Sequence, residues 1–140
     1  MTERIEVQRT IAAPSADIFA VPCDPQGHVA IDSSGMLRDA DGDPVGAVRH
    51  IHRALKDDGT LMLVEPAAGD SLADNLNPVG RVYYAASTMV CTPASLAQEV
   101  GLALGAQAGE RRLSEVLQKG GFSSVRRIAQ TDTNMVLEAR

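Results

Sequence analysis

The strongest constraint on the fold is a short, continuous apolar run, Leu61-Met62-Leu63-Val64. The turn-forming residues Asp57-Asp58-Gly59 precede this run, and Glu65-Pro66 follow it. An apolar run between turn signals is typical of a strand buried on both faces, as in a parallel sheet. We therefore expect residues 60–65 to form a central strand, and we expect Leu61–Val64 to be the most buried segment.

Local patterns predict the neighbouring elements. Apolar residues at helical spacing predict a helix at 47–56. The dipeptides Asn77-Pro78 and Thr92-Pro93 are typical helix starts, and Gly120-Gly121 is a typical helix stop. Three further helices are therefore expected, at 78–90, 92–105 and 109–119, followed by a hairpin of strands at 124–130 and 134–140.

The first part of the chain has a different pattern. Residues 3–11 alternate between apolar and polar, which predicts a half-buried strand, and residues 13–20 are typical of a short helix. Residues 32–46 are rich in Asp, Ser and Gly. This turn-rich segment marks the expected boundary between an N-terminal unit, residues 1–45, and a C-terminal unit, residues 46–140.

Composition limits the classes of partner. The 140 residues carry a net charge of −5, whereas nucleic-acid binding needs clustered Lys and Arg, so we expect no nucleic-acid partner. No stretch approaches the ~20 apolar residues of a membrane span. No leader sequence is evident, and Cys23 and Cys91 match no metal motif. A cytoplasmic protein with reduced thiols is the expectation.

The segment Arg49–Pro66, which includes Leu55-Lys56-Asp57-Asp58-Gly59 and Glu65-Pro66, resembles a known family. It is similar to the helix, turn and fifth strand of class I S-adenosylmethionine-dependent methyltransferases. The order of elements in residues 46–140 resembles the C-terminal half of that domain. The resemblance implies an α/β fold with a partial Rossmann-like sheet and helices packed on that sheet. In this sheet the last two strands form an antiparallel hairpin, and the final strand lies beside the fifth.

The segments Asn75–Met89, Cys91–Glu99 and Gly105–Gly109 resemble the helical substrate cap of a bacterial subgroup whose members often carry a winged-helix domain. This resemblance implies that Tyr83, Tyr84, Met89 and Cys91 bind the substrate, a small apolar acceptor suited to aromatic and sulfur side chains. The alternative is that these four residues form the core of a helical insert.

The glycine-rich loop that binds the methyl donor in such enzymes has no counterpart in this sequence. We therefore assign no catalytic, cofactor-binding or metal-binding residue, and we expect no cofactor for the isolated chain. The leading interpretation is a truncated methyltransferase-family protein that is inactive alone.

Residues 1–45 resemble a second family. The segment Val7–Pro14, then Ile18-Phe19 and Cys23-Asp24-Pro25, is similar to the opening of START-like or polyketide-cyclase-like (SRPBCC) proteins, a strand followed by a helix. This resemblance implies one alternative function, binding of a small hydrophobic ligand. The other alternative is a non-catalytic oligomeric remnant, in which the open sheet edge pairs with another chain. Pro22 departs from the pattern, because an apolar helical residue is expected there.

Other polar residues have simpler interpretations. His50 and His52 are two residues apart on a helix, so they lie on different faces and are not expected to share a metal. His28 is isolated in the sequence. Glu65 is expected to close its strand rather than bind a ligand, and the pairs Arg111-Arg112 and Arg126-Arg127 are expected to be solvated.

The predicted sheet leaves one edge of strand 60–65 open, because the strand that flanks it in the full methyltransferase fold is missing. An open apolar edge favours pairing. The N-terminal strand around Glu6–Ile11 or a second copy of the chain, giving a homo-oligomer, would fill it. We favour the N-terminal strand because it lies on the same chain.

Overall fold

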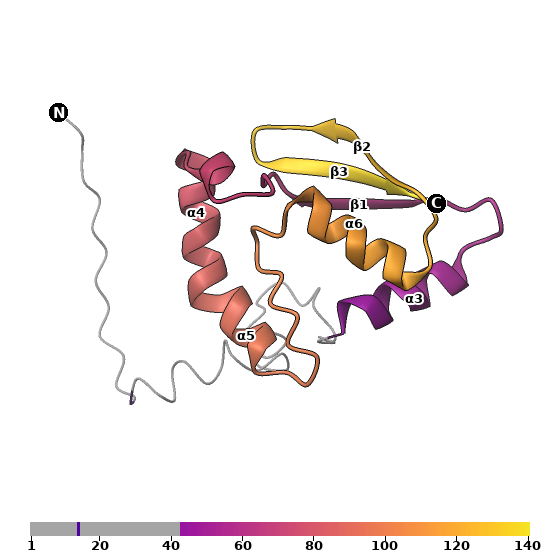
Figure 1. Ribbon diagram of the computed structural model, residues 1–140, viewed down its shortest axis with the longest axis horizontal. Helices are drawn as coiled ribbons and strands as arrows, with labels where there is room; N and C mark the ends of the chain where they lie inside the picture. Colours follow the sequence, from indigo (N-terminus) through magenta and orange to yellow (C-terminus); the bar gives the residue numbers. More distant parts are fainter. Residues whose placement is uncertain (1–13, 15–42) are drawn as a thin grey trace.

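The computed structural model describes Pro14 and residues 43–140, a mixed helix-and-sheet unit (Figure 1). Its elements are α3 (Pro44–Ala54), β1 (Leu61–Pro66), the 3-10 turn η1 (Ala73–Asn75), α4 (Pro78–Ala86), the π turn η2 (Ser87–Cys91), α5 (Thr92–Leu96), α6 (Gly109–Gly120), β2 (Val125–Gln130) and β3 (Asn134–Ala139). The expected strand 3–11, the helix 13–20 and the turn-rich segment up to residue 42 lie outside the described residues, apart from Pro14. So do Cys23 and His28.

The strands form a three-stranded antiparallel sheet in the order β1-β3-β2. The central strand β3 pairs with β1 from Leu61↔Ala139 to Pro66↔Asn134, and with β2 from Val125↔Ala139 to Gln130↔Met135. A register shift between Arg127 and Ala129 marks a bulge in β2. The expected hairpin and the placement of the last strand beside residues 60–65 are both confirmed.

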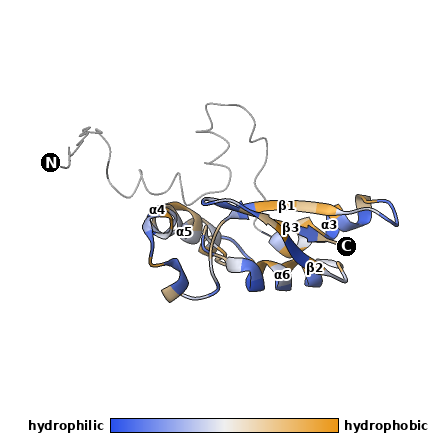
Figure 2. Ribbon diagram, turned by 90° about the horizontal axis from the view of Figure 1, so that it is seen from above, coloured by the Kyte–Doolittle hydropathy of each residue, from blue (hydrophilic) through white to orange (hydrophobic). Residues whose placement is uncertain are grey.

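Helix α6 covers one face of the sheet, and α3 packs beside α6 (Figures 1 and 2). The core is a cluster of buried side chains from α6, the turn after it and β3: Leu113, Leu117, Phe122, Met135, Leu137 and Ala139. Val48 and Leu55, from α3 and the turn after it, pack against this cluster. The expected α/β class, with helices packed on a small sheet, is confirmed at this level.

Helix α6 ends as its sequence predicts. Gly121 has φ of 123°, a conformation that residues with a side chain rarely adopt. The amide of Phe122 then donates to the carbonyl of Leu117 at 3.2 Å, and the Phe122 ring enters the core. Gly120 lies so close to α3 that an added Cβ would overlap Val48. The two glycines therefore stop α6 and let α3 approach it.

The prediction that β1 is buried on both faces was wrong. Its burial alternates, with Leu61 and Leu63 half-buried on the covered side and Met62 and Val64 exposed at 66% and 53%. The most buried strand is β3, in which Met135, Leu137 and Ala139 are at most 1% exposed. The physical reason is that the described helices cover one face only, so the apolar residues of β1 are divided between core and surface (Figure 2).

The predicted helix at 92–105 was also wrong. The chain continues without a break from α4 through η2 into α5, and α5 ends at Leu96. Thr92 has helical backbone angles, φ −69° and ψ −48°, so it does not cap a new helix. Pro93 lacks the amide that an α-helix would bond, and the wider π turn before it accommodates this. Gly101, Ala103 and Gly105 have positive φ, so no helix continues there.

Candidate functional site

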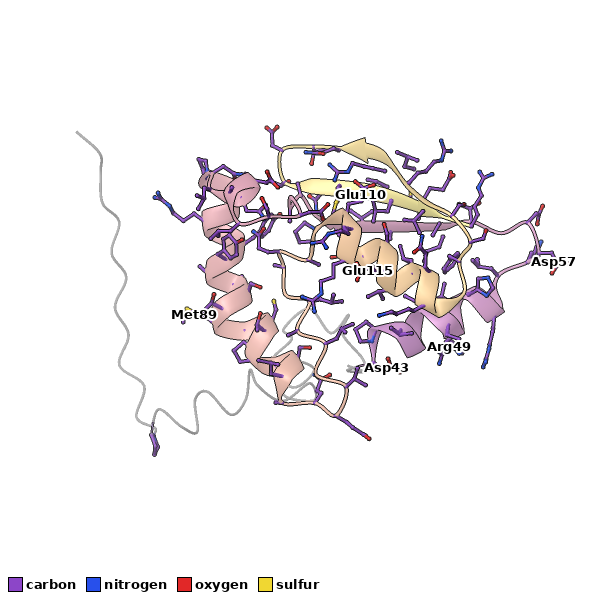
Figure 3. The ribbon with its side chains drawn as sticks, viewed as in Figure 1. Asp43, Arg49, Asp57, Met89, Glu110 and Glu115 are labelled. Carbon is purple, nitrogen blue, oxygen red and sulfur yellow. The ribbon has the colours of Figure 1, made fainter. Side chains whose placement is uncertain are left out.

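The four side chains expected to bind substrate lie on one helical arm, formed by α4, η2 and α5, but they do not converge. Tyr84 lines one hollow and Tyr83 lines another. Met89 is 60% exposed and points away from the sheet (Figure 3), and Cys91 is a half-buried free thiol. Within the described residues, the arm therefore offers two separate aromatic sites rather than one four-residue pocket.

The start of the arm is fixed by local hydrogen bonds. The Asn77 side chain caps α4 by accepting a hydrogen bond from the Gly80 amide at 2.8 Å, and Pro78 occupies the first turn. Gly80 lies against the backbone of Asn75, where any Cβ would overlap the Asn75 carbonyl oxygen. This close approach holds α4 against the preceding loop and sets the direction of the arm.

Asn75 organises that loop. Its side chain is buried, donates to the carbonyls of Gly69 and Ser71 at 3.0 Å each, and accepts from the Gly69 amide at 2.7 Å. All of these bonds are internal, so the Asn75 side chain has little capacity left for a ligand. Sequence reasoning overlooked Asn75, and a lone Asn in a loop carries no signal that would have revealed it.

The carboxylates of Asp70 and Asp74 also accept hydrogen bonds from within the protein. Asp70 accepts a hydrogen bond from the amide of Arg111 at 2.9 Å and so caps the start of α6. Asp74 accepts from the hydroxyl of Ser71 at 2.6 Å within the loop. These carboxylates hold the loop between β1 and α4 in place, and this role explains their positions.

The first hollow is open, measures about 550 Å³ and is mostly apolar. It is lined by Asn75, Leu76, Asn77, Pro78, Arg81 and Tyr84. Leu76 is 75% exposed and no ion pair of Arg81 is found among the described residues, so both side chains are available. An apolar wall, an aromatic ring and one guanidinium suit a small aromatic or alkyl molecule that carries an oxygen acceptor.

The second hollow is smaller, about 250 Å³, and lies where the arm meets the sheet. It is lined by Pro78, Val79, Val82, Tyr83 and Thr133. The Tyr83 hydroxyl donates to the carbonyl of Thr133 at 2.7 Å, in the turn between β2 and β3. This bond uses the Tyr83 hydroxyl as donor to attach the arm to the sheet, so Tyr83 has a structural role.

The two described histidines do not form a site together. His50 is exposed, whereas the ring of His52 packs edge-on against Phe122 with 4.9 Å between ring centroids. No cluster of three or more His, Cys, Asp or Glu side chains suited to a metal occurs in the described part of the chain. The geometry of His52 matches a packing role at the end of α6.

Glu65 is the penultimate residue of β1, and partial burial raises the pKa of its carboxyl above the ordinary value. No hydrogen bond or ion pair to its carboxylate is found within residues 43–140. On β2, Arg126 and Arg127 are each paired, with Glu138 at 2.8 Å and with Glu110 at 2.7 Å. The expectation of simply solvated arginines was therefore incomplete for this pair.

Comparison with known proteins adds no assignment: no protein-family profile matches the chain, and no curated protein matches it significantly. Among the described helices, none combines the length and apolar character needed to cross a membrane.

Proposed function

We propose that residues 46–140 are the C-terminal half of a Rossmann-like methyltransferase domain, and that the chain by itself neither binds the methyl donor nor transfers a methyl group. The observation that carries the proposal is the strand order β1-β3-β2, with the last strand antiparallel between β1 and its own hairpin partner. This order is the one that the resemblance of residues 46–140 implies.

Two further features support the proposal. The apolar outer side chains of β1, Met62 and Val64, are exposed, as expected if further elements of a larger domain would cover them. The arm α4–η2–α5 leaves the sheet after the carboxyl end of β1, where ligands bind in open α/β sheets. The hollow beside Tyr84 is the part of this arm suited to an acceptor.

Isothermal titration of the full chain with S-adenosylmethionine and S-adenosylhomocysteine tests the absence of donor binding. We expect no saturable binding heat at concentrations that would detect a dissociation constant of ~100 µM or tighter. Such a constant would correspond to more than ~5 kcal/mol of binding free energy. A tighter constant for either compound would overturn the proposal that the donor-binding half is missing.

The acceptor site needs a separate experiment. We propose that the Tyr84 hollow takes a small aromatic hydroxyl compound, with p-cresol as the probe in a titration followed by NMR. The resonances of Leu76, Arg81 and Tyr84 should shift when p-cresol is added. In the Tyr84→Ala variant the resonances of Leu76 and Arg81 should not shift. Val82 lines only the second hollow, so equal shifts at Val82 would indicate unspecific binding and contradict the assignment.

A further inference from the structure

The hollow beside Tyr84 has an unbalanced charge. Among the described residues that line it, Arg81 is the one charged side chain, and no carboxylate lines it. Arg81 is exposed, and its guanidinium forms no hydrogen bond or ion pair with the described part of the chain. The hollow is therefore locally positive, although the whole chain carries a net charge of −5.

The other polar groups of the hollow are divided between used and free. The side-chain amides of Asn75 and Asn77 are engaged in hydrogen bonds within the loop and with the first turn of α4. The hydroxyl of Tyr84 has no hydrogen-bond partner among the described residues. Arg81 and Tyr84 are three residues apart on α4, so they lie on the same face of the helix. A ligand in the hollow would therefore meet one guanidinium and one phenol.

The position of Arg81 does not serve the stability of α4. Arg81 lies at the end of the first turn of a helix that begins at Pro78, and that turn contains no acidic residue. The helix dipole is positive at this end, so it disfavours a cation and favours an anion. The nearest acid in the sequence, Asp74, accepts hydrogen bonds from the amide and hydroxyl of Ser71. A bound anion would balance both the helix end and Arg81.

We propose that Arg81 makes the Tyr84 hollow selective for a small aromatic carboxylate, an inference that rests on the acceptor site proposed above. The planar guanidinium matches the two oxygens of a carboxylate and binds them through paired hydrogen bonds. The aromatic ring of the ligand packs against Tyr84 and against the apolar surface of Leu76 and Pro78. A neutral phenol of the same size uses only the apolar surface and the ring.

The size of the expected preference follows from the exposure of Arg81. An ion pair with an exposed arginine is worth little, so we expect the carboxylate to improve binding by about three- to fivefold at low ionic strength. Salt screens exposed charges, so the preference should shrink in about 0.5 M sodium chloride. Packing of the ring on Tyr84 should depend much less on salt.

Two probes test the preference in an NMR titration of the full chain. 4-Hydroxybenzoate and p-cresol share the ring and the hydroxyl, and they differ only in a carboxylate or a methyl group opposite the hydroxyl. We expect 4-hydroxybenzoate to bind about three- to fivefold more tightly. Arg81→Gln should abolish this difference while leaving p-cresol binding unchanged. Arg81→Lys retains the charge without the planar fork and should retain part of the difference.

Arg111→Gln is the matched control. Arg111 is exposed and lines neither hollow of the arm, so this variant loses the same charge and should keep the full preference. Equal affinities of the parent chain for the two probes would overturn the carboxylate selectivity. So would a preference that survives Arg81→Gln or disappears in Arg111→Gln, and in these cases the acceptor site itself would stand. If neither probe shifts the resonances of Leu76 and Tyr84, the acceptor site is wrong and this inference falls with it.

Discussion

Leu137 is one of the three large side chains that are fully buried in the described part of the chain, with Leu117 and Met135. It is 0% exposed and lies at the centre of β3, the strand that pairs with both neighbours. Leu137→Ala removes the buried methyl groups and leaves a cavity among residues of α6 and the sheet. Such substitutions cost about 2–5 kcal/mol, the upper part of the range applying where the site cannot collapse.

Leu137 is held on a strand with hydrogen-bonded partners on both sides, so little collapse is available, and we expect about 3–4 kcal/mol. For a chain of this size that loss corresponds to a fall of roughly 10 °C or more in melting temperature. Urea unfolding followed by circular dichroism measures it, and the midpoint should fall while the slope with denaturant stays constant.

The matched control is Met62→Ala on the neighbouring strand. Met62 is also a large apolar residue in the sheet, but it is 66% exposed, so the same truncation should change stability by about 0.5 kcal/mol or less. Comparable losses for the two variants would refute the assignment of a covered and an uncovered face to this sheet.

Three further predictions follow from other contacts. Gly120→Ala should destabilise the protein by about 1–3 kcal/mol, because its Cβ would overlap Val48 of α3, whereas the exposed neighbour Lys119→Ala should be neutral in thermal melting. Asn75→Asp removes two donated hydrogen bonds and should cost about 1–3 kcal/mol. The cap variant Asn77→Asp retains the acceptor for the Gly80 amide and loses only an exposed hydrogen bond to the Asp74 carbonyl, so it should cost less stability than Asn75→Asp; a larger loss for Asn77→Asp would contradict the role given to Asn75. The hydrogen bond and the positive charge of Arg126 hold the pKa of the Glu138 carboxyl below the ordinary value of 4.5. The ionised Glu138 therefore stabilises the fold above that pH, and this stabilisation is lost as the pH falls through the folded-state pKa of Glu138. Arg126→Gln should raise the Glu138 pKa in an NMR titration, and an unchanged value would show that the pair is not formed in solution.

The sequence by itself determined the elements whose causes are local. The 3.6-residue apolar spacing and the stop at Gly120-Gly121 located α6, and the Asn77-Pro78 cap located the start of α4. The short connection between two predicted strands, residues 131–133, specified the β2–β3 hairpin. In each case the deciding interaction lies within a few residues of the signal, so the sequence pattern and the structure agree.

The tertiary structure decided which face of each element is covered. Leu61–Val64 is apolar throughout, so its sequence does not distinguish a strand covered on two faces from one covered on a single face. The packing of α3 and α6 on one side makes that distinction. Thr92-Pro93 has the local pattern of a helix start, but the preceding π turn continues the arm through it. Tyr83 and Tyr84 are adjacent in sequence, yet helical geometry turns them toward different hollows, and the bond to Thr133, 50 residues away, assigns Tyr83 to the scaffold. These outcomes depend on contacts between distant segments, which no local pattern encodes.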